Sequence, residues 1–180
     1  MYLTGFADEA AVSLAGQIRA TKELGWRCIE SRNIDGVNIH NLTDAAFEQA
    51  VEQLHGAGIT VNCFGSAIAN WAKDVRKPFD TDLAETRRAI PRMQRLGTKL
   101  IRIMSYPPFH DRPLNDQMEE VRFERLRVLT RLFLDAGIQP VHENCMNYGG
   151  LGWQPTLRML DAVPGLKLVF DTGNPVQTFD

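Results

Sequence analysis

The apolar positions of this chain fall into short apolar runs and longer amphipathic segments. Five of the short runs directly follow a glycine, at Gly25, Gly58, Gly97, Gly137 and Gly165. Glycine adopts the left-handed conformation that ends many helices, and a short apolar run after it is typical of a buried strand. We therefore predict five helix-to-strand links, with one further strand at the start, in residues 2–10.

The segments between these strands carry the periodicity of amphipathic helices. In residues 43–54 the apolar side chains recur three and four positions apart after Thr43, which suits an N-cap. A buried stripe is expected in residues 115–137, formed by Met118, Val121, Leu126, Leu129 and Phe133. The remaining helices are predicted at residues 13–24, 81–96 and 155–163, with a kink at Pro91. This alternation predicts a parallel sheet with its helices outside.

The connections from strand to helix are long, whereas those from helix to strand are little more than one glycine. In parallel α/β folds, long loops at the carboxyl ends of the strands build the functional site. The stretch GIQPVHENC reaches that edge and ends on His142, Glu143 and Asn144. Because side chains alternate along a strand, we predict that Glu143 points inward and His142 outward.

A second carboxylate follows the last predicted strand. The same alternation turns Asp171 inward and turns Phe170 toward the helices. Carboxylates that converge on one edge repel each other unless a cation holds them. We therefore select Glu143 and Asp171 as a candidate metal-ligand pair; the alternative is that each caps a helix or pairs with an arginine. Glu30, Arg102 and His110 also lie at predicted strand ends or in the loops that follow.

Composition sets the outer limits. The 180 residues suffice for one domain with a core, so we predict a single domain over 1–180. A net charge of −2 argues against a nucleic-acid or anionic-membrane surface, and no apolar run is long enough to span a bilayer. Three distant cysteines and a start unlike a secretory signal indicate reduced thiols and a cytoplasmic protein.

Several segments together resemble a known family. GFADEA, IESRNIDG, VNCFGSAIANW, PVHENC and VFDTGN are similar to the xylose isomerase-like barrel superfamily, within it to bacterial sugar phosphate isomerases and epimerases, over essentially the whole chain. The resemblance implies an α/β fold, a (β/α)8 barrel of the TIM type, with a divalent metal at the carboxyl edge. It implies that Glu143 and Asp171 are two of the metal ligands, while a histidine and a glutamate come from the last two strands.

The chain departs from that family in two respects. Many relatives carry a histidine three residues after the aspartate, where this chain has Asn174. The chain also ends at Asp180, whereas such a barrel needs about 250 residues. We therefore expect strands one to six without the last two βα units, as an N-terminal fragment or an incomplete gene product. Open sheet edges favour association, so we expect a homo-oligomer.

The function implied by the resemblance is metal-dependent isomerisation or epimerisation of a sugar, sugar phosphate or cyclitol, by proton abstraction next to a carbonyl. Glu143 would be both ligand and base, and the proposed substrate-binding residues are Glu30, Arg102, His110 and Asn174. The metal stays open between Mn²⁺, Mg²⁺, Co²⁺ and Zn²⁺.

Three alternatives stand beside this function. An inosose-type dehydratase would use the same first step, and a non-catalytic incomplete barrel would bind a ligand without turnover. An abasic-site endonuclease needs several ligating histidines and a basic groove, which four histidines and a net charge of −2 argue against.

Overall fold

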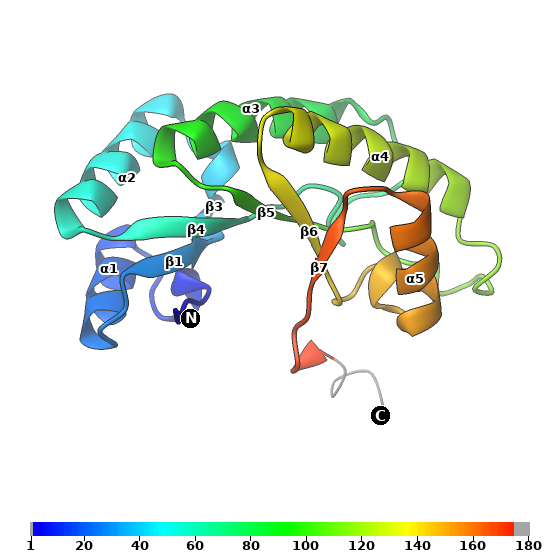
Figure 1. Ribbon diagram of the computed structural model, residues 1–180, viewed down its shortest axis with the longest axis horizontal. Coiled ribbons are helices and arrows are strands. Elements are labelled where there is room, and N and C mark those ends of the chain that lie inside the picture. Colours follow the sequence, from blue (N-terminus) through cyan, green and yellow to red (C-terminus); the bar gives the residue numbers. More distant parts are fainter. Residues whose placement is uncertain (1, 175–180) are drawn as a thin grey trace. The chain divides into compact units, whose positions relative to one another are not determined.

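The sheet contains five strands in the order β1-β4-β5-β6-β7 (Figure 1). The computed structural model describes residues 2–174. The β1–β4 and β6–β7 pairs are parallel, as predicted. The strands are β1 (Cys28–Ser31), β4 (Thr60–Gly65), β5 (Leu100–Ile103), β6 (Gln139–Glu143) and β7 (Lys167–Val169). The helices are α1 (Leu14–Glu23), α2 (Asp44–Ala57), α3 (Asp80–Leu96), α4 (Glu119–Asp135) and α5 (Trp153–Ala162).

The helix-to-strand links are those predicted. All five glycines have φ between 70° and 87°: Gly25, Gly58, Gly97, Gly137 and Gly165. At Gly58 the backbone N–H donates to the carbonyl of His55 at 3.0 Å and so closes the end of α2. A residue with a Cβ rarely adopts this conformation, so glycine is the signal that fixed these boundaries. Thr43 is the N-cap of α2, as predicted, and α3 continues through Pro91.

The predicted N-terminal strand is wrong. Residues 2–10 form one isolated bridge, between Phe6 and Glu30, and then the 3-10 helix η1 (Ala7–Glu9). The N–H of Glu30 still bonds the carbonyl of Gly5 at 2.9 Å, so this segment follows β1 without making a ladder. The hairpin of β2 (Asn33–Ile34) and β3 (Val37–Asn38), like the 3-10 helix η2 (Ile39–Asn41), is too short to leave a periodic signal.

The buried stripe of α4 differs from the predicted one in its first turn. Leu126, Leu129 and Phe133 are buried as expected, but Met118 and Val121 are only half-buried. Met118 precedes the helix with φ 52°, which takes its side chain off the helical face. Arg122 and Phe123 occupy the buried positions instead.

Arg122 is buried because it binds backbone rather than an acid. Its guanidinium donates to the carbonyls of Gln117 (2.5 Å), Ser105 (2.7 Å) and Pro107 (2.8 Å). Burial lowers the pKa of Arg122 to about 10, so it remains charged at neutral pH. These three bonds fix the loop that joins β5 to α4.

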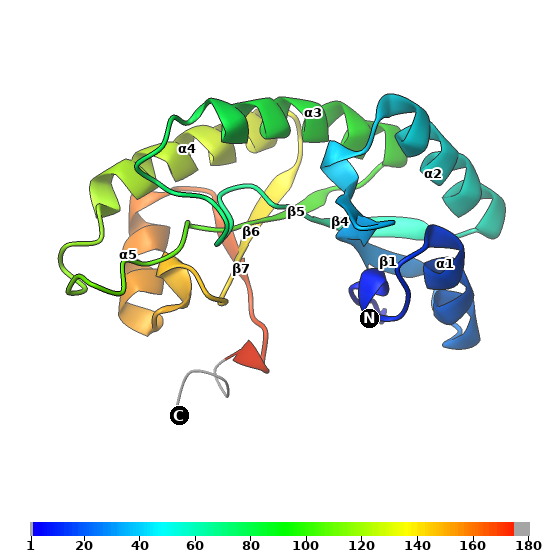
Figure 2. The ribbon, with the colours of Figure 1, turned by 180° about the vertical axis from the view of Figure 1, so that it is seen from behind.

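The chain forms two compact units, Met1–Ser66 with Arg87–Ile101 and Ala67–Thr86 with Arg102–Asp180. In the first unit, helices α1 and α2 contact each other, and β1 pairs with β4 (Figure 1). In the second, α4 packs on β6, and α5 packs on the 3-10 helix η3 (Tyr148–Gly150), as both views show (Figure 2). We refer to these as unit 1 and unit 2.

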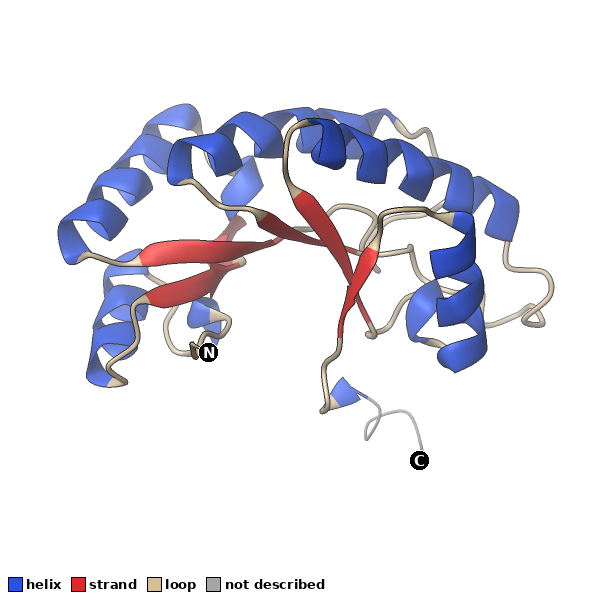
Figure 3. Ribbon diagram, in the orientation of Figure 1, coloured by secondary structure: helices blue, strands red, loops and turns tan. Residues whose placement is uncertain are grey.

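The strand-to-helix connections are the long ones, drawn as loops in Figure 3. The segment before α3 is tied down by Asp82, whose carboxylate accepts from the N–H of Ala69 (2.9 Å), Lys73 (2.5 Å) and the hydroxyl of Tyr106 (2.7 Å). Burial and this carboxylate raise the pKa of Tyr106. Within residues 2–174, no helix combines the length and apolar character needed to cross a membrane.

Candidate active site

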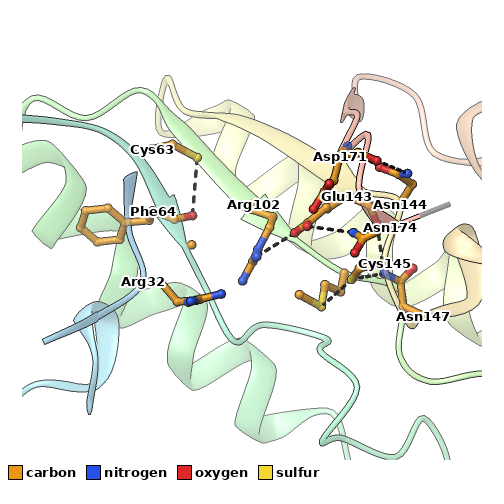
Figure 4. A network of polar contacts seen from close by, with 12 residues as sticks. Arg32, Cys63, Phe64, Arg102, Glu143, Asn144, Cys145, Asn147, Asp171 and Asn174 are labelled. Carbon is orange, nitrogen blue, oxygen red and sulfur yellow. Dashed lines mark hydrogen bonds and ion pairs between the residues drawn. The ribbon is translucent and has the colours of Figure 1, made fainter. Parts of the chain in front are cut away.

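A buried ion pair joins the ends of two strands in unit 2. Glu143 is the last residue of β6, and its Oε2 accepts from Nη1 of Arg102 on β5 at 2.7 Å (Figure 4). The two side chains are 9% and 8% exposed. A buried carboxylate is tolerated when a well-placed cation compensates its charge. Arg102 supplies that cation for Glu143 at this edge.

The chain after β7 brings two more polar groups to the same place. Asn174 donates from Nδ2 to Oε1 of Glu143, at the long distance of 3.3 Å. Asp171 lies two residues beyond Val169, which pairs with Glu143 in the register of β6 and β7. Its Oδ1 accepts from the N–H of Gly173 at 2.7 Å, while its Oδ2 bonds no described residue. Glu143, which ends β6, and Asp171, which follows the adjacent parallel strand β7, are called the carboxylate pair.

The donor chemistry of the carboxylate pair fits a hard divalent cation. Asp171 has one oxygen without a hydrogen bond among residues 2–174, and Oε1 of Glu143 has only the long bond from Asn174. Magnesium and manganese prefer such oxygen ligands. Burial and the nearby charge of Glu143 raise the pKa of the Cys145 thiol, which disfavours a thiolate ligand. Over the described chain, no three or more His, Cys, Asp and Glu side chains form a metal site.

The face of β6 opposite Glu143 carries a different set of contacts. His142 is fully buried, and its Nε2 lies 3.0 Å from Oγ of Ser105. The same Oγ donates to Oδ1 of Asn147 (2.6 Å) and accepts the N–H of Gly149 (2.8 Å). We call these four residues the Ser105 cluster. Burial lowers the pKa of His142 to about 4, so its imidazole is neutral.

A model of the family described as Xylose isomerase-like TIM barrel matches residues 18–180. The chain belongs to this family. No curated protein sequence matches it. The parallel α/β arrangement predicted from the residue pattern and the TIM-type barrel implied by the resemblance are thereby confirmed, and the five strands of the sheet belong to a xylose isomerase-like TIM barrel.

Solved structures agree on the fold of this xylose isomerase-like chain. A probable 3-DHS dehydratase, AsbF, from Bacillus anthracis has a TM-score of 0.74 at 15% identity, with 95% of this chain and 63% of that one covered. A xylose isomerase-like TIM barrel protein from Mycobacterium smegmatis, in complex with magnesium, has a TM-score of 0.72 at 15% identity, with 97% and 65% covered.

A third structure carries a sugar. D-psicose 3-epimerase from Clostridium cellulolyticum H10, with D-tagatose, has a TM-score of 0.69 at 17% identity, with 100% and 66% covered. The present chain thus spans about two thirds of the length of these structures. At this level of identity the likeness establishes the fold and leaves the activity open.

The structure brings together four of the six predicted site residues of this xylose isomerase-like chain. Glu143 contacts Arg102 and Asn174, and Asp171 follows the neighbouring strand. His110 is exposed and makes no hydrogen bond with residues 2–174, and Glu30 lies in unit 1. Their proposed contacts with substrate stay predictions.

Sequence reasoning missed two features of the site. Phe170, expected to face the helices, is 69% exposed, because the chain after β7 leaves the sheet. The side chain of Asn144, given no role from sequence, bonds the backbone of Asp171. The only signal for it is its place directly after Glu143 in the HEN stretch.

Proposed function

We propose that this chain carries the site of a divalent-metal-dependent isomerase or epimerase that acts on a sugar, sugar phosphate or cyclitol. The reaction is the transfer of a proton at a carbon next to a carbonyl. The observation that carries the proposal is the carboxylate pair at the ends of adjacent strands, with Arg102 on one of its oxygens. The family and the fold of neighbouring epimerases support it.

Glu143 is assigned the proton transfer. Its Oε2 is held by Arg102, which fixes the plane of the carboxylate, and its Oε1 keeps only the weak bond from Asn174. Oε1 has two lone pairs, so one can take the substrate proton while the other binds the cation, since a general base must reach that proton with an uncommitted lone pair. When bound by Glu143 and Asp171, a divalent cation would stabilise negative charge on substrate oxygens. Mn²⁺, Mg²⁺, Co²⁺ and Zn²⁺ all remain candidates.

The substrate class is assigned by analogy with the neighbour that holds D-tagatose. Asn174 and Arg102 are proposed to bind substrate hydroxyl or phosphate oxygens, with Glu30 and His110 as further contacts. Elimination of water after the same proton transfer is the second candidate, favoured by the likeness to the dehydratase AsbF. The two are separated by their products, because only the lyase forms an unsaturated one.

Self-association and a cytoplasmic site of action complete the proposal. Among residues 2–174, β7 is an edge strand, and its three residues are all exposed, with Leu168 at 45% and Val169 at 38%. Exposed apolar residues on an open strand favour pairing with another copy. The mass in solution of the preparation used below tests this part directly.

The decisive experiment measures the exchange of substrate hydrogen with solvent deuterium, so it does not depend on knowing the product. The purified 180-residue chain is incubated in D2O with a panel of ketoses and ketose phosphates, adding Mn²⁺, Mg²⁺, Co²⁺ or Zn²⁺ singly. We expect metal-dependent deuterium incorporation next to the carbonyl, detected by NMR. The variant Asp171→Asn should lose it, whereas the control Asp161→Asn, at an exposed aspartate of α5, should keep it.

Two results would contradict the proposal. One is bound metal, measured by titration, with no exchange on any sugar of the panel. The other is exchange in Asp171→Asn equal to that of the unaltered chain.

A further inference from the structure

The side chain of Asn144 holds the backbone of Asp171 at both of its polar atoms. Nδ2 of Asn144 donates to the carbonyl oxygen of Asp171 at 2.9 Å, and Oδ1 accepts the N–H of Asp171 at 2.6 Å (Figure 4). A primary amide has one donor side and one acceptor side, so it matches a peptide unit as a neighbouring strand would. The 2.9 Å bond lies within the ordinary range for N–H···O hydrogen bonds, and the 2.6 Å bond is slightly shorter than that range.

Little else fixes this part of the chain. The register of β6 and β7 ends at the pair Glu143 and Val169, so the strand ladder stops before Asp171. All three residues of β7 are exposed, and Phe170 is 69% exposed, so side-chain packing contributes little there. The amide of Asn144 extends the pairing of the two strands by side-chain bonds, where backbone bonds have ended.

The consequence concerns the carboxylate of Asp171. Because Asn144 satisfies the peptide N–H and C=O of Asp171, the carboxylate is not drawn into bonding its own backbone N–H. It keeps one oxygen uncommitted beside the end of β6. Groups that orient metal ligands in this way commonly change metal affinity 10- to 100-fold when they are removed.

We propose that Asn144 is a positioning residue that sets the Asp171 carboxylate opposite Glu143 for binding a divalent cation. The inference rests on the proposed function, in which those two carboxylates bind the metal. Both halves of the amide are required, since an aspartate at position 144 would turn a second negative oxygen toward the Asp171 carbonyl. An apolar side chain loses the match to the peptide unit, and an amide on a longer stem keeps it only in part.

The test combines an exchange measurement with a metal titration. The variants are Asn144→Leu, close in size and without hydrogen bonds, and Asn144→Gln, which keeps the amide on a longer stem. The matched control is Asn115→Leu, at an exposed asparagine of the loop before α4. Exchange of the Asp171 amide is followed by NMR of the labelled 180-residue chain without metal, and Mn²⁺ affinity by electron paramagnetic resonance.

We expect Asn144→Leu to expose the Asp171 amide to exchange and to weaken Mn²⁺ binding by about 10-fold or more. Asn144→Gln should recover part of both, and Asn115→Leu should change neither. Unchanged protection and affinity in Asn144→Leu would overturn the inference. If the thermal transition of Asn144→Leu is lost, the Gln variant decides the matter by the same two measurements.

The outcome separates this inference from the proposed function. If the unaltered chain binds no Mn²⁺ yet Asn144→Leu frees the Asp171 amide, the proposed metal site fails. The two bonds from the Asn144 side chain are then only structural, which overturns the positioning role. If Mn²⁺ binds and Asn144→Leu leaves its affinity unaltered, the metal site stands and the positioning role falls.

Discussion

His142 and Glu143 are consecutive residues of β6, yet they belong to two polar regions of unit 2 with opposite character. His142 lies in the Ser105 cluster, where the Ser105 hydroxyl is shared among three partners and no group reaches solvent. Glu143 lies in the carboxylate pair, where Oε1 and one oxygen of Asp171 remain open to a ligand. Both regions are almost fully buried at β6.

The difference shows that burial of a polar side chain says little about its role. The strand alternation decides the face, and the number of uncommitted atoms decides what can bind. The Ser105 cluster ties the loop after β6 to the end of β5, because Ser105 and Asn147 come from those two segments. The carboxylate pair keeps oxygens free, as a site of chemistry requires.

The largest effect is expected from substituting Glu143 and His142 one at a time. Glu143→Gln keeps an oxygen for Arg102 but removes the proposed base, so proton exchange on the substrate should fall by at least about 100-fold. His142→Ala should leave exchange and metal affinity intact and lower the free energy of unfolding by about 1–3 kcal/mol. Deuterium incorporation and urea denaturation measure the two effects.

An exposed glutamate serves as the control for charge. Glu120→Gln, on α4, removes the same charge away from both regions and should change neither quantity. The proposed difference between the two regions would be contradicted if the His142→Ala protein is folded and binds metal normally but exchanges no protons on the substrate.

The next effect is a pH dependence confined to the Ser105 cluster. The pKa of His142 is about 4 in the folded chain against an ordinary value of 6.5, because burial disfavours the imidazolium. As pH falls below 6.5, His142 binds a proton in the unfolded chain but stays neutral in the folded chain. Stability is therefore lost between pH 6.5 and pH 4, by roughly 3 kcal/mol from this group.

The variant His142→Phe separates the loss of stability caused by His142 from the losses caused by other groups that titrate. His142→Phe should be less stable at pH 7 but should lose less stability on acidification to pH 4.5, as measured by urea denaturation. Equal losses in the two proteins would mean that His142 is protonated in the folded chain.

Sequence alone predicted the parts of this contrast that depend on local pattern. The glycine C-caps located the points where the helices end and the strands begin, and alternation separated His142 from Glu143 without reference to the fold. The partners were not predictable, because Ser105 and Arg102 lie 37 and 41 residues from their partners in sequence. Which groups meet depends on the register between strands, which apolar periodicity does not encode.

Side chains that act against their usual preference were also missed. Arg122 reads as a polar position of α4, yet it is buried because three loop carbonyls accept its protons. The role of Asn144 depends on the path of the chain after β7, which no residue pattern fixes. Such groups are invisible to periodicity because they bond backbone atoms of distant segments.

The smallest expected effect comes from a change in packing at Gly149, within the Ser105 cluster. A Cβ on Gly149 would lie 2.5 Å from Cε1 and 2.9 Å from Nε2 of His142, closer than real contacts allow. Gly149→Ala must therefore displace the imidazole or the loop, at a cost of about 1–3 kcal/mol.

Gly56→Ala is the matched control, because a Cβ there meets nothing within 4 Å on helix α2 and should stabilise that helix by about 1 kcal/mol. Calorimetric melting should show a lower transition for Gly149→Ala and a higher one for Gly56→Ala, with Mn²⁺ affinity equal in both, since the change lies on the face of β6 opposite Glu143. Weaker Mn²⁺ binding in Gly149→Ala would show that the two faces of β6 are mechanically coupled rather than independent.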